Sequence, residues 1–141
     1  MRNVWVQEEE KIMSKKSTIE QVREFNQAYG LPLPEKPSLS DGQIELQCDL
    51  MREEFGEFES AYVSGNIIEA LDGLLDMQYI LDGLFLKLGM ADIKAEAFAE
   101  VHRSNMSKLG EDGKPILRED GKILKGPNYF KPDLAKFLTP N

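Results

Sequence analysis

Two groups of carboxylates in the middle of the chain are the residues best suited to do chemistry. They are Glu53, Glu54 and Glu57, followed by Asp72 and Asp76. On an α-helix, residues three or four positions apart share a face, so the members of each group would lie side by side. Like charges at this spacing repel one another and weaken the helix slightly. Each group therefore needs interactions with other parts of the protein, or with bound ions, that offset this repulsion.

The second group lies in a segment that is apolar on nearly every side, from Ile67 to Leu88. A helix of this kind is normally buried, and a buried carboxylate is costly unless it is paired or bound to a metal. Protein counter-charges are scarce, because residues 41–100 contain three Lys or Arg against fourteen Asp or Glu. We therefore expect divalent cations to hold these carboxylates together.

The composition limits the classes of function that the chain can have. A length of 141 residues fits one domain, and the single cysteine, Cys48, excludes an intramolecular disulfide and a cysteine-based zinc site. The formal net charge of −8 argues against a general affinity for nucleic acid or an anionic membrane. Neither a bilayer-spanning apolar run nor a secretory signal is visible, so we expect a cytoplasmic protein.

The charge is unevenly distributed along the chain. Residues 41–100 carry a net charge of −11, whereas residues 103–136 carry eight basic and five acidic side chains, a net charge of +3. This distribution fits a site that holds cations in the middle of the chain and anions near its end. Ordinary surface charge explains it equally well.

The hydrophobic periodicity predicts an all-α fold, an antiparallel bundle of about four helices. The expected helices run from a Ser17 cap to Tyr29, from Ser40 or Asp41 to Val63, and over residues 66–88 and 91–108. After Gly110, segments 116–118 and 122–124 flank an Asp-Gly bend and predict a small β-hairpin, followed by an irregular tail.

The first sixteen residues stand apart from this pattern. Met13 begins a sequence typical of a protein start, and Glu8-Glu9-Glu10 lies just upstream, where its codons could contain a ribosome-binding sequence. We therefore predict that residues 1–16 are a disordered or non-native extension and that native translation begins at Met13. Residues 17–141 would form the domain.

The apolar helix over residues 66–88 also predicts self-association. A small bundle of four helices would leave one side of such a helix in water, and exposed apolar patches of that size usually mark interfaces. We expect the bundle to be completed by oligomerisation, as a homodimer or a homotetramer.

The acidic pattern also resembles that of a known group of enzymes. Glu53-Glu54-x-x-Glu57 on one helix, with Asp76 followed by Tyr79 on the next, is similar to the all-α nucleoside triphosphate pyrophosphohydrolases. This group includes the MazG-like enzymes, the dimeric dUTPases and phosphoribosyl-ATP pyrophosphohydrolase. Their usual signature is Glu-Glu-x-x-Glu followed by Glu-x-x-Asp.

This chain departs from the second half of that signature, because Gly73 stands three residues before Asp76. Asp72 lies within the same turn and would take that role. Segments 101–109 and 125–132 look like a phage and bacterial subgroup labelled phosphoribosyl-ATP pyrophosphohydrolase-like. The resemblance covers roughly residues 17–134.

The resemblance implies hydrolysis of a nucleoside triphosphate between the α and β phosphates, with Mg²⁺ as cofactor and Mn²⁺ as a possible substitute. It implies that Glu53, Glu57 and Asp76 are metal ligands, with Asp72 in place of the missing Glu. Glu54 would be a ligand or the base that activates water. Glu69 is a possible outer ligand. Carboxylate oxygens are the ligands that Mg²⁺ prefers, which supports this assignment independently.

Cations near the end of the chain would bind the phosphates that the metal leaves exposed. The candidates are Arg103, Lys108 and Lys125, with Asn105 contacting the sugar or base. Arg103 has a plainer alternative, an ion pair with Glu100. Two other functions remain open: true phosphoribosyl-ATP hydrolysis, and a non-catalytic helical oligomer that binds divalent cations.

Overall fold

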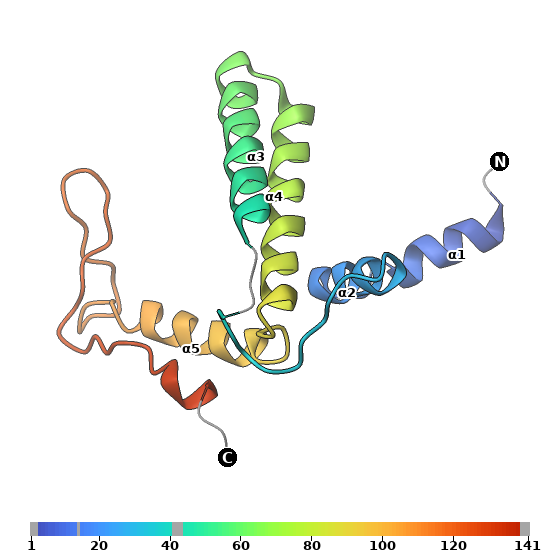
Figure 1. Cartoon of the computed structure of the whole chain (residues 1–141). Helices are drawn as coiled ribbons and strands as arrows, with labels where there is room; N and C mark the ends of the chain where they lie inside the picture. Colours follow the sequence, from blue (N-terminus) through green and yellow to red (C-terminus); the bar gives the residue numbers. More distant parts are fainter. Residues whose placement is uncertain (1–2, 14, 41–43, 139–141) are drawn as a thin grey trace. The chain divides into compact units, whose positions relative to one another are not determined.

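The computed structural model describes residues 3–13, 15–40 and 44–138. The chain divides into two compact units, Met1–Ala91 and Asp92–Asn141. The first unit contains α1 (Val4–Met13), α2 (Thr18–Ala28), α3 (Glu45–Ser64) and α4 (Ile67–Lys87). The second contains α5 (Lys94–Met106) and a 3₁₀ turn, η1 (Ala135–Phe137) (Figure 1). The described residues form no β-strand, so the all-α prediction is confirmed.

Helix α2 begins where its capping residues predict. The Glu20 backbone N–H donates to Ser17 Oγ at 3.3 Å, and the Ser17 N–H donates to the Glu20 carboxylate at 3.2 Å. This reciprocal pair satisfies two N–H groups that the first helical turn leaves without partners. The helix ends at Ala28, followed by Gly30 in the left-handed region at φ 65°.

Helices α3 and α4 form an antiparallel hairpin (Figure 1). Gly65 ends α3 in the left-handed conformation at φ 71°, which costs glycine little. Asn66 then caps α4, because its side-chain oxygen accepts the Glu69 N–H at 3.1 Å. The predicted short turn between these helices is therefore confirmed, and both ends of it are set by local hydrogen bonding.

The predicted start of α3 at Ser40 or Asp41 is wrong. The Ser40 N–H donates to Ser38 Oγ at 3.2 Å, a local turn that competes with helix. Asp41 lies outside the described residues, and α3 begins at Glu45 after Ile44, which provides no side-chain cap. A serine side chain can accept a backbone hydrogen bond in a local turn as readily as at a helix N-cap, and the sequence does not distinguish the two.

The two helices of the hairpin lie close together at Gly73. A Cβ atom added to Gly73 would lie 3.2 Å from the Cβ of Phe58 on α3, which is tighter than ordinary side-chain packing. Helix α2 also packs against α4. The buried apolar side chains of the first unit include Val22, Ala61 and Leu86, one from each of these three helices.

Much of the apolar surface of α4 faces solvent in the single chain. The exposed residues include Leu71, at 57% exposure, and Leu75, at 59%, together with Ile67, Ile68, Leu74 and Leu81. An exposed apolar face of this length is unusual for a monomer. The structure describes one chain, and oligomerisation stays a prediction. In the part of the chain that is described, no helix is both long enough and apolar enough to cross a bilayer.

The second unit is built from α5 and the tail that follows it. The Ser104 hydroxyl donates to the Phe130 carbonyl at 2.8 Å, and the Phe130 N–H donates to Ser107 Oγ at 3.1 Å. These bonds fix the tail on α5. The helix itself runs over Lys94–Met106, shorter at both ends than predicted, because residues 91–93 form a turn.

The predicted β-hairpin over 116–118 and 122–124 is reduced to one isolated antiparallel bridge between Leu117 and Ile123. The turn is correct, since the Gly121 N–H donates to the Arg118 carbonyl at 2.9 Å and Gly121 has φ 88°. A two-stranded ribbon needs a third strand or a packing face to persist. Both bridged side chains are more than half exposed, so neither support is present.

The segment predicted to be disordered or non-native, residues 1–16, is helical over Val4–Met13. The disordered alternative therefore does not describe these ten residues. The other alternative, a non-native extension with translation starting at Met13, stays a prediction, as does the single domain over residues 17–141.

The contact at Gly73 generates a stability prediction. Gly56, within α3, has open space where a Cβ would stand. We expect Gly56→Ala to raise the free energy of unfolding by about 0.5–1 kcal/mol, the usual difference in helix propensity. Gly73→Ala should show no such gain or a loss, because Phe58 must move. Urea unfolding of both variants measures this, and equal gains would show that Phe58 does not restrict the position.

Candidate functional site

The carboxylates of α3 and α4 gather on one acidic face, which we define as Glu53, Glu54 and Glu57 of α3 with Asp76 of α4. The pKa of Glu54 is raised above its ordinary value of 4.5, first by burial and then by the negative charges of Glu57, Asp76 and Glu53. Residues from both helices therefore act on one carboxyl group. The antiparallel packing of α3 on α4 brings together residues about twenty positions apart in the sequence.

Glu54 is the central residue of this acidic face. Its Oε2 atom is enclosed and has no hydrogen-bond partner, and it is the one such side-chain atom among the described residues. A buried polar atom without a partner is costly, and a negative one beside like charges more so. The local structure thus leaves a position that a cation or a proton would stabilise.

Asp72 does not belong to this acidic face. Its side chain is exposed, and its charge is not among those that raise the pKa of Glu54. Gly73 is the α4 residue that faces α3, so Asp72 lies about 100° away from that contact around the helix axis. The structure therefore does not bring Asp72 together with the other predicted ligands.

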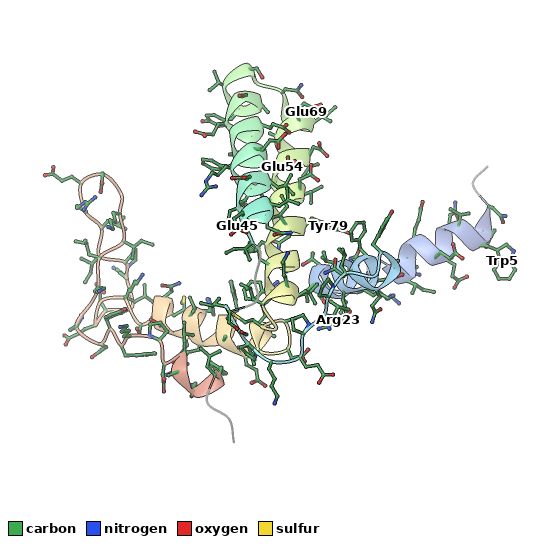
Figure 2. The ribbon with its side chains drawn as sticks, in the orientation of Figure 1. Trp5, Arg23, Glu45, Glu54, Glu69 and Tyr79 are labelled. Atoms are coloured by element: carbon green, nitrogen blue, oxygen red, sulfur yellow. The ribbon has the colours of Figure 1, made fainter. Side chains whose placement is uncertain are left out.

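Unlike Asp72, Glu69 lines a groove that it shares with carboxylates of α3. An open groove of about 770 Å³ runs along α3 toward the turn, and Glu53, Glu57 and Glu69 all line it. Figure 2 shows Glu69 and Glu54 on the same hairpin, with Glu69 nearer the turn. Glu69, Gly73 and Asp76 are spaced i, i+4 and i+7, which places them on one face of α4. This spacing was the sequence signal for Glu69.

The carboxylates are not preassembled as a metal centre. Within the described ranges, no three His, Cys, Asp or Glu side chains converge closely enough to hold an ion. The type of donor nevertheless fits a hard cation, because every candidate offers carboxylate oxygens and Glu54 Oε2 has no partner. Ligation by Glu53, Glu54, Glu57, Asp72 and Asp76 stays a prediction.

Arg103 of α5 has partners within its own unit. Its guanidinium donates to both carboxylate oxygens of Glu100 at 2.9–3.1 Å and lies 4.3 Å from the centre of the Phe130 ring. Lys136 adds a second cation at 3.5 Å from Glu100. The plainer alternative for Arg103, an ion pair with Glu100, is therefore confirmed, and its contact with substrate stays a prediction.

The other predicted substrate-binding residues differ in the contacts that their side chains make. The Lys125 ammonium lies 4.7 Å from the centre of the Tyr129 ring, within cation–π range. The side chains of Asn105 and Lys108 make no hydrogen bond or ion pair within the described residues, and Asn105 is exposed. Lys108 contributes its backbone carbonyl, which accepts the Gly126 N–H at 2.8 Å.

Comparison with known families identifies the class of protein. The family model described as phosphoribosyl-ATP pyrophosphohydrolase matches residues 22–105, more than half of the chain. The match contains all of α3 and α4 and therefore the whole acidic face. A comparison with curated proteins finds no match.

The fold and this match place the protein among the MazG-like all-α nucleoside triphosphate pyrophosphohydrolases. Within that superfamily, the chain belongs to the phosphoribosyl-ATP pyrophosphohydrolase family. The resemblance found in the sequence is thereby confirmed. Membership implies a pyrophosphohydrolase that acts on a nucleotide.

The buried carboxylate of Glu100 predicts a pH-dependent stability. The Asp133 N–H at 3.0 Å and then Arg103 stabilise its ionised form, so its pKa is lowered from the ordinary 4.5. A lowered folded-state pKa means that this contribution is complete above pH 4.5 and is lost as the pH falls through the lower value. We expect Glu100→Gln to lower stability at neutral pH and to flatten its acid dependence.

Thermal melting between neutral pH and about pH 3 measures this effect. Glu111→Gln is the matched control, since Glu111 is exposed in the same unit. An acid dependence that is the same in both variants and in the parent protein would contradict the assignment.

Proposed function

We propose that the protein hydrolyses a nucleoside triphosphate, a deoxynucleotide in the first instance, between its α and β phosphates, with Mg²⁺ as cofactor. The single observation that carries this proposal is the enclosed, unpartnered Oε2 atom of Glu54 beside Glu53, Glu57 and Asp76. A structural carboxylate would be paired, whereas one poised for proton transfer needs a raised pKa. Family membership supports the reaction class.

The acidic face supplies the ligands for the metal in this proposal. Glu53, Glu57 and Asp76 would hold Mg²⁺, and Mn²⁺ could replace it. Glu69 is a better fourth ligand than Asp72, because it lines the groove with Glu53 and Glu57. When bound, the ion would neutralise phosphate oxygens and stabilise the charge that develops on them.

Glu54 is the proposed general base. Its raised pKa makes the carboxylate a better acceptor for a proton from water near neutral pH. The water oxygen attacks the α-phosphorus and forms the new bond. The bond from that phosphorus to the α–β bridging oxygen breaks, and pyrophosphate leaves with this oxygen. The proton of the attacking water passes to Glu54.

Phosphate oxygens beyond the metal need positive donors, and Lys108 is the best candidate among the predicted residues. Its side chain has no partner within the described residues, unlike Arg103, which Glu100 already holds in a two-pronged contact. Arg103, Asn105 and Lys125 remain proposed substrate contacts.

Phosphoribosyl-ATP is a second candidate substrate, since the matching family model is described by that activity. The same bond between α and β phosphates would be cleaved. Gly73, which stands in place of the signature glutamate, and the tail beyond residue 105 argue for a different substrate. A non-catalytic, metal-binding helical oligomer is the third candidate.

The decisive experiment measures pyrophosphate release from deoxynucleoside triphosphates, ribonucleoside triphosphates and phosphoribosyl-ATP, with and without Mg²⁺. We expect Mg²⁺-dependent release and a fall in turnover of about 100-fold or more for Glu54→Gln, the usual contribution of a general base. Glu59→Gln is the control, because Glu59 is exposed on the same helix and outside the acidic face.

Equal and mild effects of the two substitutions would show that the acidic face is merely solvated. Absence of hydrolysis together with a melting temperature that rises with Mg²⁺ would favour the non-catalytic oligomer. A melting temperature that responds to neither Mg²⁺ nor EDTA would contradict a metal site on this face.

The exposed apolar surface of α4 supports the proposal of a homodimer or homotetramer. Leu71 and Leu75 are four residues apart and both more than half exposed, so they share one apolar face. Burying such side chains stabilises an interface by about 1.5–3 kcal/mol each. A second copy of α4 is the simplest partner for a face of this kind.

We therefore expect light scattering at micromolar concentration to give the mass of two or four chains. Leu75→Glu should shift the protein to monomers, because a carboxylate would be buried without a partner. Leu39→Glu is the control, since Leu39 is exposed in the linker before α3. A well-folded monomer in the parent protein would contradict the proposal.

A further inference from the structure

A cavity of about 220 Å³ lies in the first unit, between α2, α3 and α4. Its lining is mainly apolar and aromatic and includes Val22, Phe25, Leu31, Leu50, Tyr79 and Ile80. Two amide side chains, Asn26 and Gln47, complete the wall together with Lys87. A concave, mostly apolar site with a few polar groups is the usual form of a small-molecule pocket.

Asn26 is the residue that distinguishes this cavity from a packing defect. It is only 7% exposed, and its side-chain amide makes no hydrogen bond within the described residues. Unlike Oε2 of Glu54, the amide atoms of Asn26 are not fully enclosed, so they can bond to a molecule that occupies the cavity. Since Asn26 lines the cavity, a ligand there can supply the missing donor and acceptor.

The aromatic side chains suit a flat ring as that ligand. Phe25 and Tyr79 meet edge to face, with ring centres 5.5 Å apart and planes at 89°. Tyr29 also packs against Phe25, at 4.3 Å between ring centres. Rings arranged in this way leave faces and edges that attract another aromatic ring.

The cavity lies next to the acidic face along the same two helices. Leu50 and Ile80 line the cavity, and each lies four residues from a carboxylate of the acidic face, Glu54 and Asp76. Four residues correspond to about one helical turn, roughly 5–6 Å. Figure 2 shows Glu69, Glu54 and Tyr79 in this order along the hairpin, from the turn toward α2. A nucleotide can thus span from the cavity to the carboxylates.

We propose that this cavity binds the nucleobase of the substrate and that Asn26 recognises its hydrogen-bonding edge. The inference rests on the proposed function, because it places the phosphates of the same molecule on the acidic face. The amide of Asn26 offers one acceptor and two donors, which match the adjacent donor and acceptor on the edge of a base.

The size of the cavity suits a pyrimidine. An engineered apolar cavity of about 150 Å³ accommodates benzene, and pockets for drug-sized ligands begin at about 300 Å³. A volume of 220 Å³ therefore accommodates one six-membered ring with its exocyclic groups. The purine bases, with two fused rings, fill it less well.

Kinetics on one variant tests the assignment. Asn26→Leu keeps the approximate volume and removes the hydrogen-bonding groups. We expect the KM for pyrimidine triphosphates to rise about tenfold, the effect of one lost hydrogen-bonded contact. Hydrolysis of inorganic tripolyphosphate, which has no base, should not change. Gln27→Leu is the matched control, because Gln27 is the next residue of α2 and is exposed.

A second measurement is independent of hydrolysis. The side-chain NH₂ signal of Asn26, observed by NMR without metal, should move when a pyrimidine nucleoside monophosphate is added and should not move with inorganic phosphate. A moving signal in a protein without hydrolytic activity would refute the proposed function and leave the base site standing.

Active protein in which this signal stays fixed, with Asn26→Leu kinetics equal to those of the parent, would overturn the base site and leave the proposed function intact. An increase in melting temperature for Asn26→Leu with unchanged KM would also overturn it, because the cavity would then be an ordinary packing position. A stronger shift with purine than with pyrimidine nucleotides would overturn the size argument.

Discussion

The close packing of α3 on α4 around Gly73 is the constraint on which the site depends. Without a side chain at that position, Phe58 comes within contact distance of the α4 backbone. The helices can then bring Glu54 into the field of Asp76, although like charges oppose the approach. Apolar packing along the hairpin thus supplies the free energy that concentrates negative charge on one face. Part of the packing free energy is therefore offset by the repulsion around Glu54, which also raises the pKa of its carboxyl group.

The sequence predicted those features that depend on local chemistry. The Ser17 capping box, the turn between α3 and α4 and the left-handed glycines all follow from residues within four positions of one another. The start of α3 could not be predicted, since Ser40 bonds to Ser38 and takes part in a turn instead. The prediction of a β-hairpin after Gly110 was wrong for a different reason. A strand needs a partner surface to pack against, and the local sequence pattern does not show whether one is present.

The candidate site also combines features that depend on local sequence with features that depend on tertiary packing. Carboxylate spacing predicted that Glu53, Glu54 and Glu57 share a face of one helix, and the structure brings Asp76 of the next helix close to them. The choice between Asp72 and Glu69 depends on which side of α4 faces α3, a tertiary fact that one helix cannot reveal. The burial of Asn26 was not predicted, since an asparagine in an amphipathic helix resembles any surface residue in the sequence.

The contact between Gly73 and Phe58 also restricts how this sequence can change over evolutionary time. A glutamate at position 73 would complete a Glu-x-x-Asp pattern with Asp76, but its Cβ would lie 3.2 Å from the Cβ of Phe58. Restoring the signature in one step would therefore cost packing before it could add a ligand. The contact involves the Cβ and the backbone of Phe58, so a smaller side chain at position 58 would not relieve it, and the two helices would have to move apart. Glu69, one turn earlier on α4, already lines the groove beside Glu53 and Glu57 without meeting this obstacle.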